Sequence, residues 1–207
     1  MQNLRFSWTT ENMCNHYQNH PEAIPTWQEY IGAAGGSPFS EIKIDVWPKY
    51  QGVVARIDGG QKMLDTMQWG VPLTMKGKRA GTTVTKRITN VRNLSSPFWR
   101  SMLTKAENRC LVPFTKFAEP KPNAGREECW FEVKEASVSA FAGIWRPSDE
   151  GNVFAFLTCG PNPLIKPIHP KAMPVILHPQ DYDGWLSGED AKTFAVPFPS
   201  QLMSMGA

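Results

Sequence analysis

Short runs of apolar residues, either alternating with polar ones or continuous, recur along most of the chain and are separated by Gly and Pro. Strict alternation is typical of a strand with one buried face, and a short β-branched run is typical of a strand buried on both faces. The runs that predict strands are Glu41–Val46, Gly52–Ile57, Met63–Val71, Thr82–Val91, Arg109–Phe114, Glu128–Lys134, Val138–Trp145, Val153–Cys159 and Met173–Leu177.

Helical signals are fewer. Pro21–Ala34 reads as a short helix closed by glycines, and Pro97–Glu107 follows a serine cap with Pro at its first position. A short helix is also predicted over Pro179–Ser187, and the tail from Pro197 is expected to wrap over the surface. Many strands with few helices between them predict an α+β fold, mainly antiparallel sheet curled toward a barrel with a few flanking helices.

Length and composition favour one cytoplasmic domain. The chain has 207 residues, enough for one core, and its four cysteines form no Cys-x-x-Cys pair. It has no apolar run of about 18 residues and no secretion signal, so we expect no membrane association. Residues 1–13 are polar and without periodicity, and we interpret them as a leader that is removed or lies before the true start, with the domain spanning 14–207. We expect a monomer without a cofactor.

Basic residues gather in one part of the sequence. The window 76–109 holds nine of the 22 basic residues and one of the 19 acidic residues, so the remainder of the chain is net acidic. A localised basic patch on a nearly neutral protein is typical of a nucleic-acid binding surface. A solvated loop and helix face remains the alternative.

Met13-Cys14 would create an unusual nucleophile if Cys14 became the first residue. An N-terminal cysteine carries a free α-amine with a pKa of about 7.7 to 8.0 beside its thiol. The amine can form a Schiff base with an aldehyde, and the thiol can close on the same carbon to give a thiazolidine. Inside a longer chain, Cys14 would instead be a small buried apolar residue.

Three later stretches place polar residues where they could serve such chemistry. Asn90 and Arg92 lie two apart on a predicted strand, so both could face one groove. Glu119 follows an apolar stretch, where a carboxyl tends toward a raised pKa, and His169 precedes a buried strand with a side chain suited to proton transfer. Taken singly, Asn90 also fits a turn asparagine and Arg92 a surface arginine. Glu119 also fits a solvated loop glutamate, and His169 a structural histidine.

The order of these motifs resembles the SRAP family, the SOS response-associated peptidase domain of abasic-site-processing proteins. The resemblance runs from about Met13 to Leu186. The motifs that carry it are Met-Cys, Trp-Gly-x-Pro, Asn-x-Arg, Arg-Cys-Leu-Val-Pro-x-x-x-Phe-x-Glu, Thr-x-x-x-Asn and His-x-x-x-Met-Pro-x-x-Leu.

The resemblance implies a β-rich α+β fold that binds single-stranded DNA and links its N-terminal cysteine covalently to abasic sites. Cys14 would be the nucleophile, Asn90 would hold its amine or the opened sugar, Glu119 would move protons, and His169 would assist ring opening or crosslink reversal. The same residues would serve self-cleavage before Cys14. The residues expected to bind DNA are Arg92, Lys86, Arg87, Lys78, Arg79, Trp69 and Asn162.

The chain departs from the family pattern in three places. The usual Cys-Gly-Arg becomes Cys14-Asn15-His16, and the usual Asn-Ala-Arg-x-Glu becomes Asn90-Val91-Arg92-Asn93-Leu94. The usual Phe-Tyr-Glu-Trp becomes Phe117-Ala118-Glu119-Pro120. The four residues that carry the chemistry are kept, while their surroundings differ, so the sequence indicates a divergent member.

Two other functions stay open. One is a non-covalent module that binds single strands through the basic window and stacks bases on exposed aromatics such as Trp99 or Trp69. The other is a thiol peptidase that pairs Cys14 with His169, although the sequence shows no third orienting residue. The spacing of Cys14, His16 and His20 fits no common zinc pattern, so no metal site is predicted.

Overall fold

A computed structural model describes residues 14–35, 43–79 and 81–206. The predicted leader, residues 1–13, lies outside this part of the chain. No helix within it is long and apolar enough to cross a membrane.

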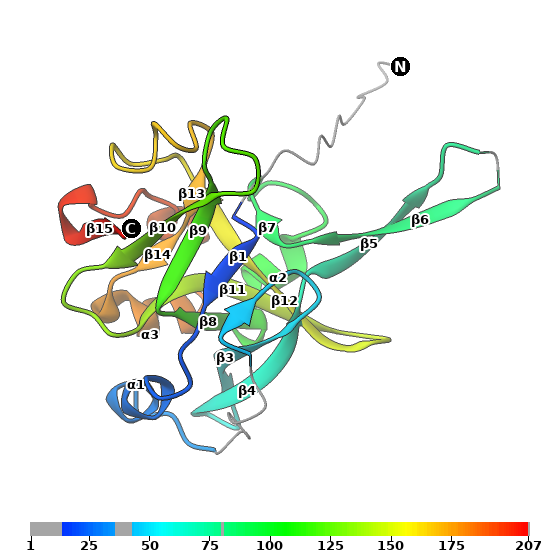
Figure 1. The fold of residues 1–207 in the computed structure, drawn as a ribbon. Coiled ribbons are helices and arrows are strands. Elements are labelled where there is room, and N and C mark those ends of the chain that lie inside the picture. Colours follow the sequence, from blue (N-terminus) through cyan, green and yellow to red (C-terminus); the bar gives the residue numbers. More distant parts are fainter. Residues whose placement is uncertain (1–13, 36–42, 80, 207) are drawn as a thin grey trace.

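The centre of the molecule is a closed five-stranded barrel with the strand order β12-β4-β3-β8-β11 (Figure 1). A second pairing of β11, with β12, closes the ring, and only β4 and β12 run parallel. The barrel strands are β3 (Gln51–Asp58), β4 (Gln61–Trp69), β8 (Arg109–Phe114), β11 (Ser139–Ser148) and β12 (Gly151–Cys159). Three short strands add to it: β7 (Asn90–Val91), β13 (Met173–Pro174) and β14 (Ile176–Leu177).

A second, antiparallel sheet packs on the barrel in the order β15-β10-β9-β1-β2. Its strands are β1 (His16–Gln18), β2 (Asp45–Val46), β9 (Lys116–Pro120), β10 (Glu128–Val133) and β15 (Met203–Gly206). An aromatic core joins the two layers: Phe117 of β9 contacts Phe114 and Phe141 of the barrel, and the last two rings stack with centroids 3.9 Å apart. This packing places β1, and with it Cys14, against the barrel.

The helices are short and cover the other buried cluster, which includes Trp27, Trp185 and Phe194. They are α1 (Ile24–Tyr30), α2 (Arg100–Thr104), α3 (Tyr182–Leu186) and α4 (Ala191–Phe194), with 3-10 helices η2 (Ala106–Asn108), η3 (Pro179–Asp181) and η4 (Ser200–Leu202).

Strands β5 (Val71–Lys76) and β6 (Thr83–Ile88) form a separate two-stranded sheet that projects from the body (Figure 1). We call it the ribbon. At its base the chain passes through Thr89 directly into β7. The ribbon carries the first part of the basic window, and its second strand leads directly to Asn90.

The predicted α+β fold built on a barrel-like antiparallel sheet is confirmed, and Arg109–Phe114 forms a strand with the predicted bounds. The strand predicted over Thr82–Val91 is broken at Thr89, because β6 pairs with β5 whereas β7 pairs with β12. The helix predicted over Pro97–Glu107 is confined to a short α2 followed by η2.

The sequence did not predict four strands, β1, β5, β9 and β15. In β9 the core-facing Glu119 interrupts the apolar pattern that would mark a strand. The tail from Pro197, expected to lie on the surface, buries Phe198 and Met203 and ends in β15, which pairs with β10.

Candidate active site

Cys14 lies immediately before β1, in the aromatic core between the two sheets. Its side chain is 1% exposed, and its thiol donates a hydrogen bond to the carbonyl of His16 at 3.7 Å. Burial raises the pKa of the Cys14 thiol well above its usual range, and the nearby carboxylate of Glu119 raises it further. The thiol is therefore protonated near neutral pH, so its attack on a ligand requires a neighbouring group that accepts a proton.

Asn90 on β7 fixes the backbone of Cys14. Its Nδ2 donates to the Cys14 carbonyl oxygen at 3.1 Å and to Oγ1 of Thr89 at 2.9 Å. The pairing of β7 with β12 holds Asn90 opposite Phe156, and its side chain is buried. The Oδ1 atom of Asn90 is buried without a hydrogen-bond partner, so it can still accept one from a ligand or from an amine.

Glu119 and His169 form a pair beside Cys14. Glu119 is fully buried on β9, and its Oε2 lies 3.2 Å from Nδ1 of His169, close but not aligned for a hydrogen bond. Burial raises the pKa of Glu119, while His169 opposes the rise. A carboxyl with a raised pKa can donate and accept protons nearer neutral pH than an exposed one.

Several polar atoms around Cys14 are buried without an aligned partner. They are Oδ1 of Asn90, both carboxyl oxygens of Glu119 and Nδ1 of His169; Oγ1 of Thr158 on β12 is likewise buried and unpartnered. Thr158 was not predicted as a site residue, although the Thr-x-x-x-Asn motif contains it; two residues beyond Phe156 on β12, it faces the same side as Asn90. Such atoms are costly to leave unpaired, so their gathering indicates a place for a small polar ligand.

Arg92 and Asn162, predicted to bind DNA, hold the loop that carries His169. Arg92 is exposed and donates to the carbonyl of Lys171 at 2.9 Å. Asn162 is buried, accepts from the backbone N–H groups of Leu164 and Ile165, and donates to the carbonyl of Phe198 at 2.8 Å. Arg92 keeps an exposed guanidinium that can bind phosphate, whereas Asn162 has no free surface in this arrangement.

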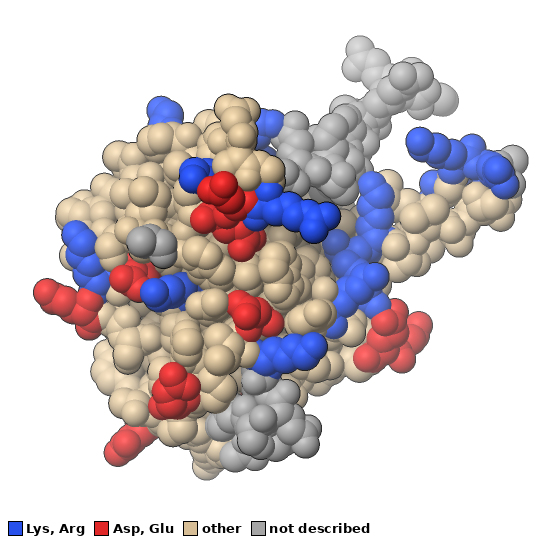
Figure 2. Space-filling view, viewed as in Figure 1, with Lys and Arg blue, Asp and Glu red and all other residues tan. Residues whose placement is uncertain are grey.

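The basic window is spread over the ribbon and the surface near β7 and α2, and among its basic residues only Arg109 is buried. Lys78 and Arg79 are exposed at the ribbon tip and Lys86 is partly exposed, in the region where basic side chains gather in Figure 2. Arg87 forms an ion pair with Glu150 and is mostly covered. Arg109 is buried with its guanidinium over the Trp185 ring at 3.8 Å, and burial lowers its pKa to about 10. The positive surface is therefore smaller than the sequence suggested.

The two aromatics named as exposed stacking partners are buried. Trp69 is 0% exposed, and its indole donates to the carbonyl of Thr89 at 3.1 Å; Trp99 is 2% exposed. The expectation that these rings are exposed was wrong, because both fill the core. Trp69 instead supports the segment that leads into Asn90.

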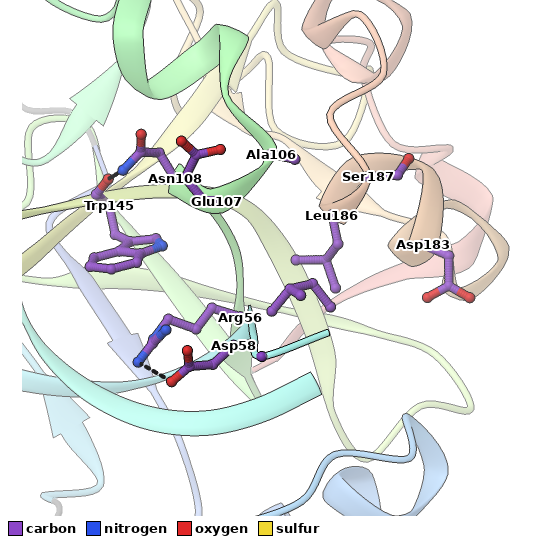
Figure 3. Close-up of a pocket in the computed structure, with 11 residues that line it drawn as sticks. Arg56, Asp58, Ala106, Glu107, Asn108, Trp145, Asp183, Leu186 and Ser187 are labelled. Carbon is purple, nitrogen blue, oxygen red and sulfur yellow. Dashed lines mark hydrogen bonds and ion pairs between the residues drawn. The ribbon is translucent and has the colours of Figure 1, made fainter. Parts of the chain in front are cut away.

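A separate cavity of about 680 Å³ lies between β3, β11, η2 and α3 (Figure 3). It contains none of the predicted site residues. Its acidic residues are each near a cation: Asp58 pairs with Arg56, as drawn in Figure 3, Asp183 pairs with Lys62, and Glu107 lies 3.8 Å from Lys105. This cavity offers no free charge for catalysis.

Comparison with known proteins identifies the family of the chain. The profile of the family described as "SOS response associated peptidase (SRAP)" matches residues 13–205. No curated protein matches the chain.

Among solved structures, a protein from Bordetella bronchiseptica superposes with a TM-score of 0.73 at 24% identity, covering 93% of this chain and 98% of its own. A protein from Bacteroides thetaiotaomicron gives 0.73 at 21% identity, covering 93% and 90%. A phage-related protein from Bordetella bronchiseptica gives 0.64 at 17% identity, covering 94% and 92%. These likenesses show that the fold is shared.

Proposed function

Because this chain belongs to the SRAP family, we propose that it is an abasic-site sensor that binds single-stranded DNA and joins it covalently through Cys14. Membership of the family supports a role in the response to DNA damage and an interaction with DNA. The observation that carries the finer proposal is the setting of Cys14: its carbonyl is held by Asn90, and its thiol lies in a buried site with Glu119 and His169.

The proposed reaction begins once residues 1–13 have been removed, which frees the α-amine of Cys14. The amine adds to the aldehyde carbon of the opened sugar, and loss of one water gives a Schiff base. The Cys14 sulfur then adds to the same carbon, and the thiol proton passes to the nitrogen, which closes the thiazolidine. Without a free amine the first step cannot occur.

The surrounding residues supply proton transfer and position. Glu119, with its raised pKa, takes a proton from the adding amine and returns one to the departing water. His169 assists at the sugar oxygen during ring opening or reversal, and Asn90 orients the amine through its unpartnered Oδ1. The same groups would serve cleavage of the Met13–Cys14 bond, because the attacking thiol gives up a proton and the departing amine takes one up, after which water hydrolyses the thioester.

The proposed DNA-binding surface extends from Arg92 along the ribbon to Lys86, Lys78 and Arg79. These side chains are wholly or partly exposed, and the ribbon has no acidic residue to offset them. Because β6 leads directly into Asn90, a bound strand would run from the ribbon to Cys14. Arg87 would contribute less because Glu150 neutralises it, and Trp69 and Asn162 are left out because they are buried.

A general cysteine peptidase is less well supported. Glu119, whose Oε2 lies 3.2 Å from Nδ1 of His169, is a candidate for the third residue that the sequence did not reveal. However, Cys14 is covered and the pKa of its thiol is raised, whereas a cysteine that attacks other proteins needs access and a lowered thiol pKa. These features favour reaction with one small group over cleavage of protein substrates.

Intact mass spectrometry before and after incubation with single-stranded DNA containing one abasic site tests the proposal. We expect a protein mass that begins at Cys14 and a denaturant-resistant adduct short of one water. Cys14→Ser keeps the amine but exchanges sulfur for oxygen, so it should give mainly an adduct that survives only after borohydride reduction. A full-length mass on protein that still forms the adduct, or the same stable adduct with Cys14→Ala, would refute the mechanism.

A further inference from the structure

His16, two residues after Cys14, occupies an unusual place on the outer face of the second sheet. Its side chain is only 7% exposed. The ring stacks on Trp47 with centroids 3.8 Å apart and meets the edge of Trp130 at 4.6 Å. The register places Ala118 opposite both His16 and Trp130, and its small side chain lets the two rings meet across β9.

Both ring nitrogens of His16 face carboxylates from other strands. Nδ1 lies 2.8 Å from Oε2 of Glu128 on β10, and Nε2 lies 2.9 Å from Oδ1 of Asp45 on β2. The Gln18 amide, with help from His16, holds the pKa of Asp45 below its usual value, so this carboxyl is ionised and can only accept. A neutral imidazole has one N–H, so only an imidazolium could donate to two ionised carboxylates at these two positions.

The other groups around the ring do not replace its charge. Gln18 donates to Asp45 at 2.9 Å, and His20 acts on Asp45 only at a distance. Among the described residues, the rings that contact His16 are those of Trp47 and Trp130, and Ala118 lies opposite it in the register; all three are uncharged. His16 thus bridges β2 and β10 across the strand that positions Cys14.

Two links connect this bridge to the candidate active site. The carbonyl of His16 accepts the hydrogen bond of the Cys14 thiol, so the position of His16 sets the direction of the sulfur. In addition, burial is the main cause of the raised pKa of both Cys14 and Glu119, and the charge of Glu128 adds a smaller rise to each. A cation on His16 offsets that charge at its source.

We propose that His16, as an imidazolium held between Asp45 and Glu128, is a positioning residue that aligns Cys14 and neutralises Glu128 next to the reacting groups. The proposal rests on the proposed function in taking Cys14 as the reacting residue. The chain departs from the family pattern at His16 and at Ala118, and these two residues are cross-strand neighbours here. This arrangement is consistent with the cation of His16 replacing the arginine cation of the usual Cys-Gly-Arg.

The pH profile of crosslinking separates this role from simple support of the fold. In His16→Gln, Glu128 is uncompensated, so the rising limb of the rate should move to higher pH by about one unit, with about a tenfold loss at pH 7. Glu128→Gln in addition should return the limb to its original position. His16→Arg, which restores a permanent cation, should keep most of the rate. His20→Gln, at a partly exposed histidine paired with Glu22, tests whether losing a more distant histidine has a smaller effect.

Two readouts do not depend on crosslinking. Nitrogen NMR of the full chain should show both ring nitrogens of His16 protonated at pH 7. In His16→Gln, the pH dependence of Cys14 alkylation by iodoacetamide should shift to higher pH, as measured by peptide-level mass spectrometry. A neutral ring, or an equal loss at every pH in His16→Gln that Glu128→Gln does not reverse, would overturn the proposal. If no variant forms a DNA adduct while these two readouts behave as expected, the proposed function fails and the role of His16 stands.

Discussion

The side-chain amide of Asn90 donates to the backbone carbonyl of Cys14, with 3.1 Å between Nδ2 and the oxygen. The two residues are 76 positions apart, and the contact joins the second sheet to β7 on the barrel. It ties the segment before β1 to the strand that follows the basic ribbon. The residue proposed to react is thereby fixed to the segment proposed to guide DNA.

Replacing Asn90 by Ala should therefore weaken both the fold and the reaction. Loss of the buried hydrogen bonds is expected to cost about 1 to 3 kcal/mol in the free energy of unfolding. The rate of adduct formation should fall at least about tenfold, because the amine loses its orientation. Urea unfolding and a time course on denaturing gels measure the two effects, with Asn152→Ala, near a surface turn, as control. An unchanged rate would remove Asn90 from the site.

The free energy of unfolding should decrease as pH rises, because the buried carboxyl of Glu119 loses its proton. Burial raises the pKa of this carboxyl in the folded state above its unfolded value of about 4.3. Between the two values the folded state binds more protons than the unfolded state, so the free energy of unfolding falls as pH rises.

Glu119→Gln lacks this titration, so the stability of the wild type relative to the variant should be highest below about pH 4.3 and decline above it. Urea unfolding from acidic to neutral pH gives the difference, and Glu22→Gln at an exposed glutamate should show no such decline. A difference that grows with pH would mean that His169 stabilises an ionised Glu119 in the folded state.

The ribbon tip should contribute to DNA binding through charge alone. Each phosphate contact to a single strand makes the slope of log K against the log of the salt concentration more negative by about 0.7. Changing Lys78 and Arg79 to Gln should therefore reduce the magnitude of the slope by about 1.4, measured by fluorescence anisotropy with labelled single strands. Lys134 and Lys192, exposed on other elements, form the matched pair. Equal slopes for both double variants would place the DNA elsewhere.

Gly52 should be needed for the packing beneath β1. A Cβ built there would lie 2.3 Å from the hydroxyl of Tyr17 and 3.1 Å from the ring of Phe154, both of which are buried. We expect Gly52→Ala to lower the free energy of unfolding by about 1 to 3 kcal/mol. Gly160→Ala, where the added methyl meets nothing within 4 Å, should have little effect. Urea midpoints compare the two variants, and equal midpoints would show that Tyr17 moves freely.

The candidate site was partly predictable because its residues stand in ordered motifs. Cys14, Asn90, Glu119 and His169 were each named from the sequence, and the structure links Asn90 to Cys14 and Glu119 to His169. Their proposed roles remain predictions. Thr158 stood in a motif as well, but one threonine in an apolar strand has no local signal that separates it from core residues.

Other assignments depended on where the chain turns back on itself. A tryptophan in the sequence does not reveal whether its ring is exposed, and Trp69 proved to be core. Arg109 lies in a basic window yet is buried against Trp185, which is 76 residues away. Arg92 supports the loop of His169 through a carbonyl 79 residues further along. Such contacts leave no trace in local periodicity.

The sequence by itself determined the strand-rich architecture, the concentration of basic residues and the choice of candidate reactive side chains, since these follow from local pattern and residue chemistry. Only the tertiary structure decided which charges are exposed, the protonation of the Cys14 thiol and the partners of His16. Burial and the approach of charges distant in sequence determine those properties: Asp45 and Glu128 reach His16 from 29 and 112 residues away.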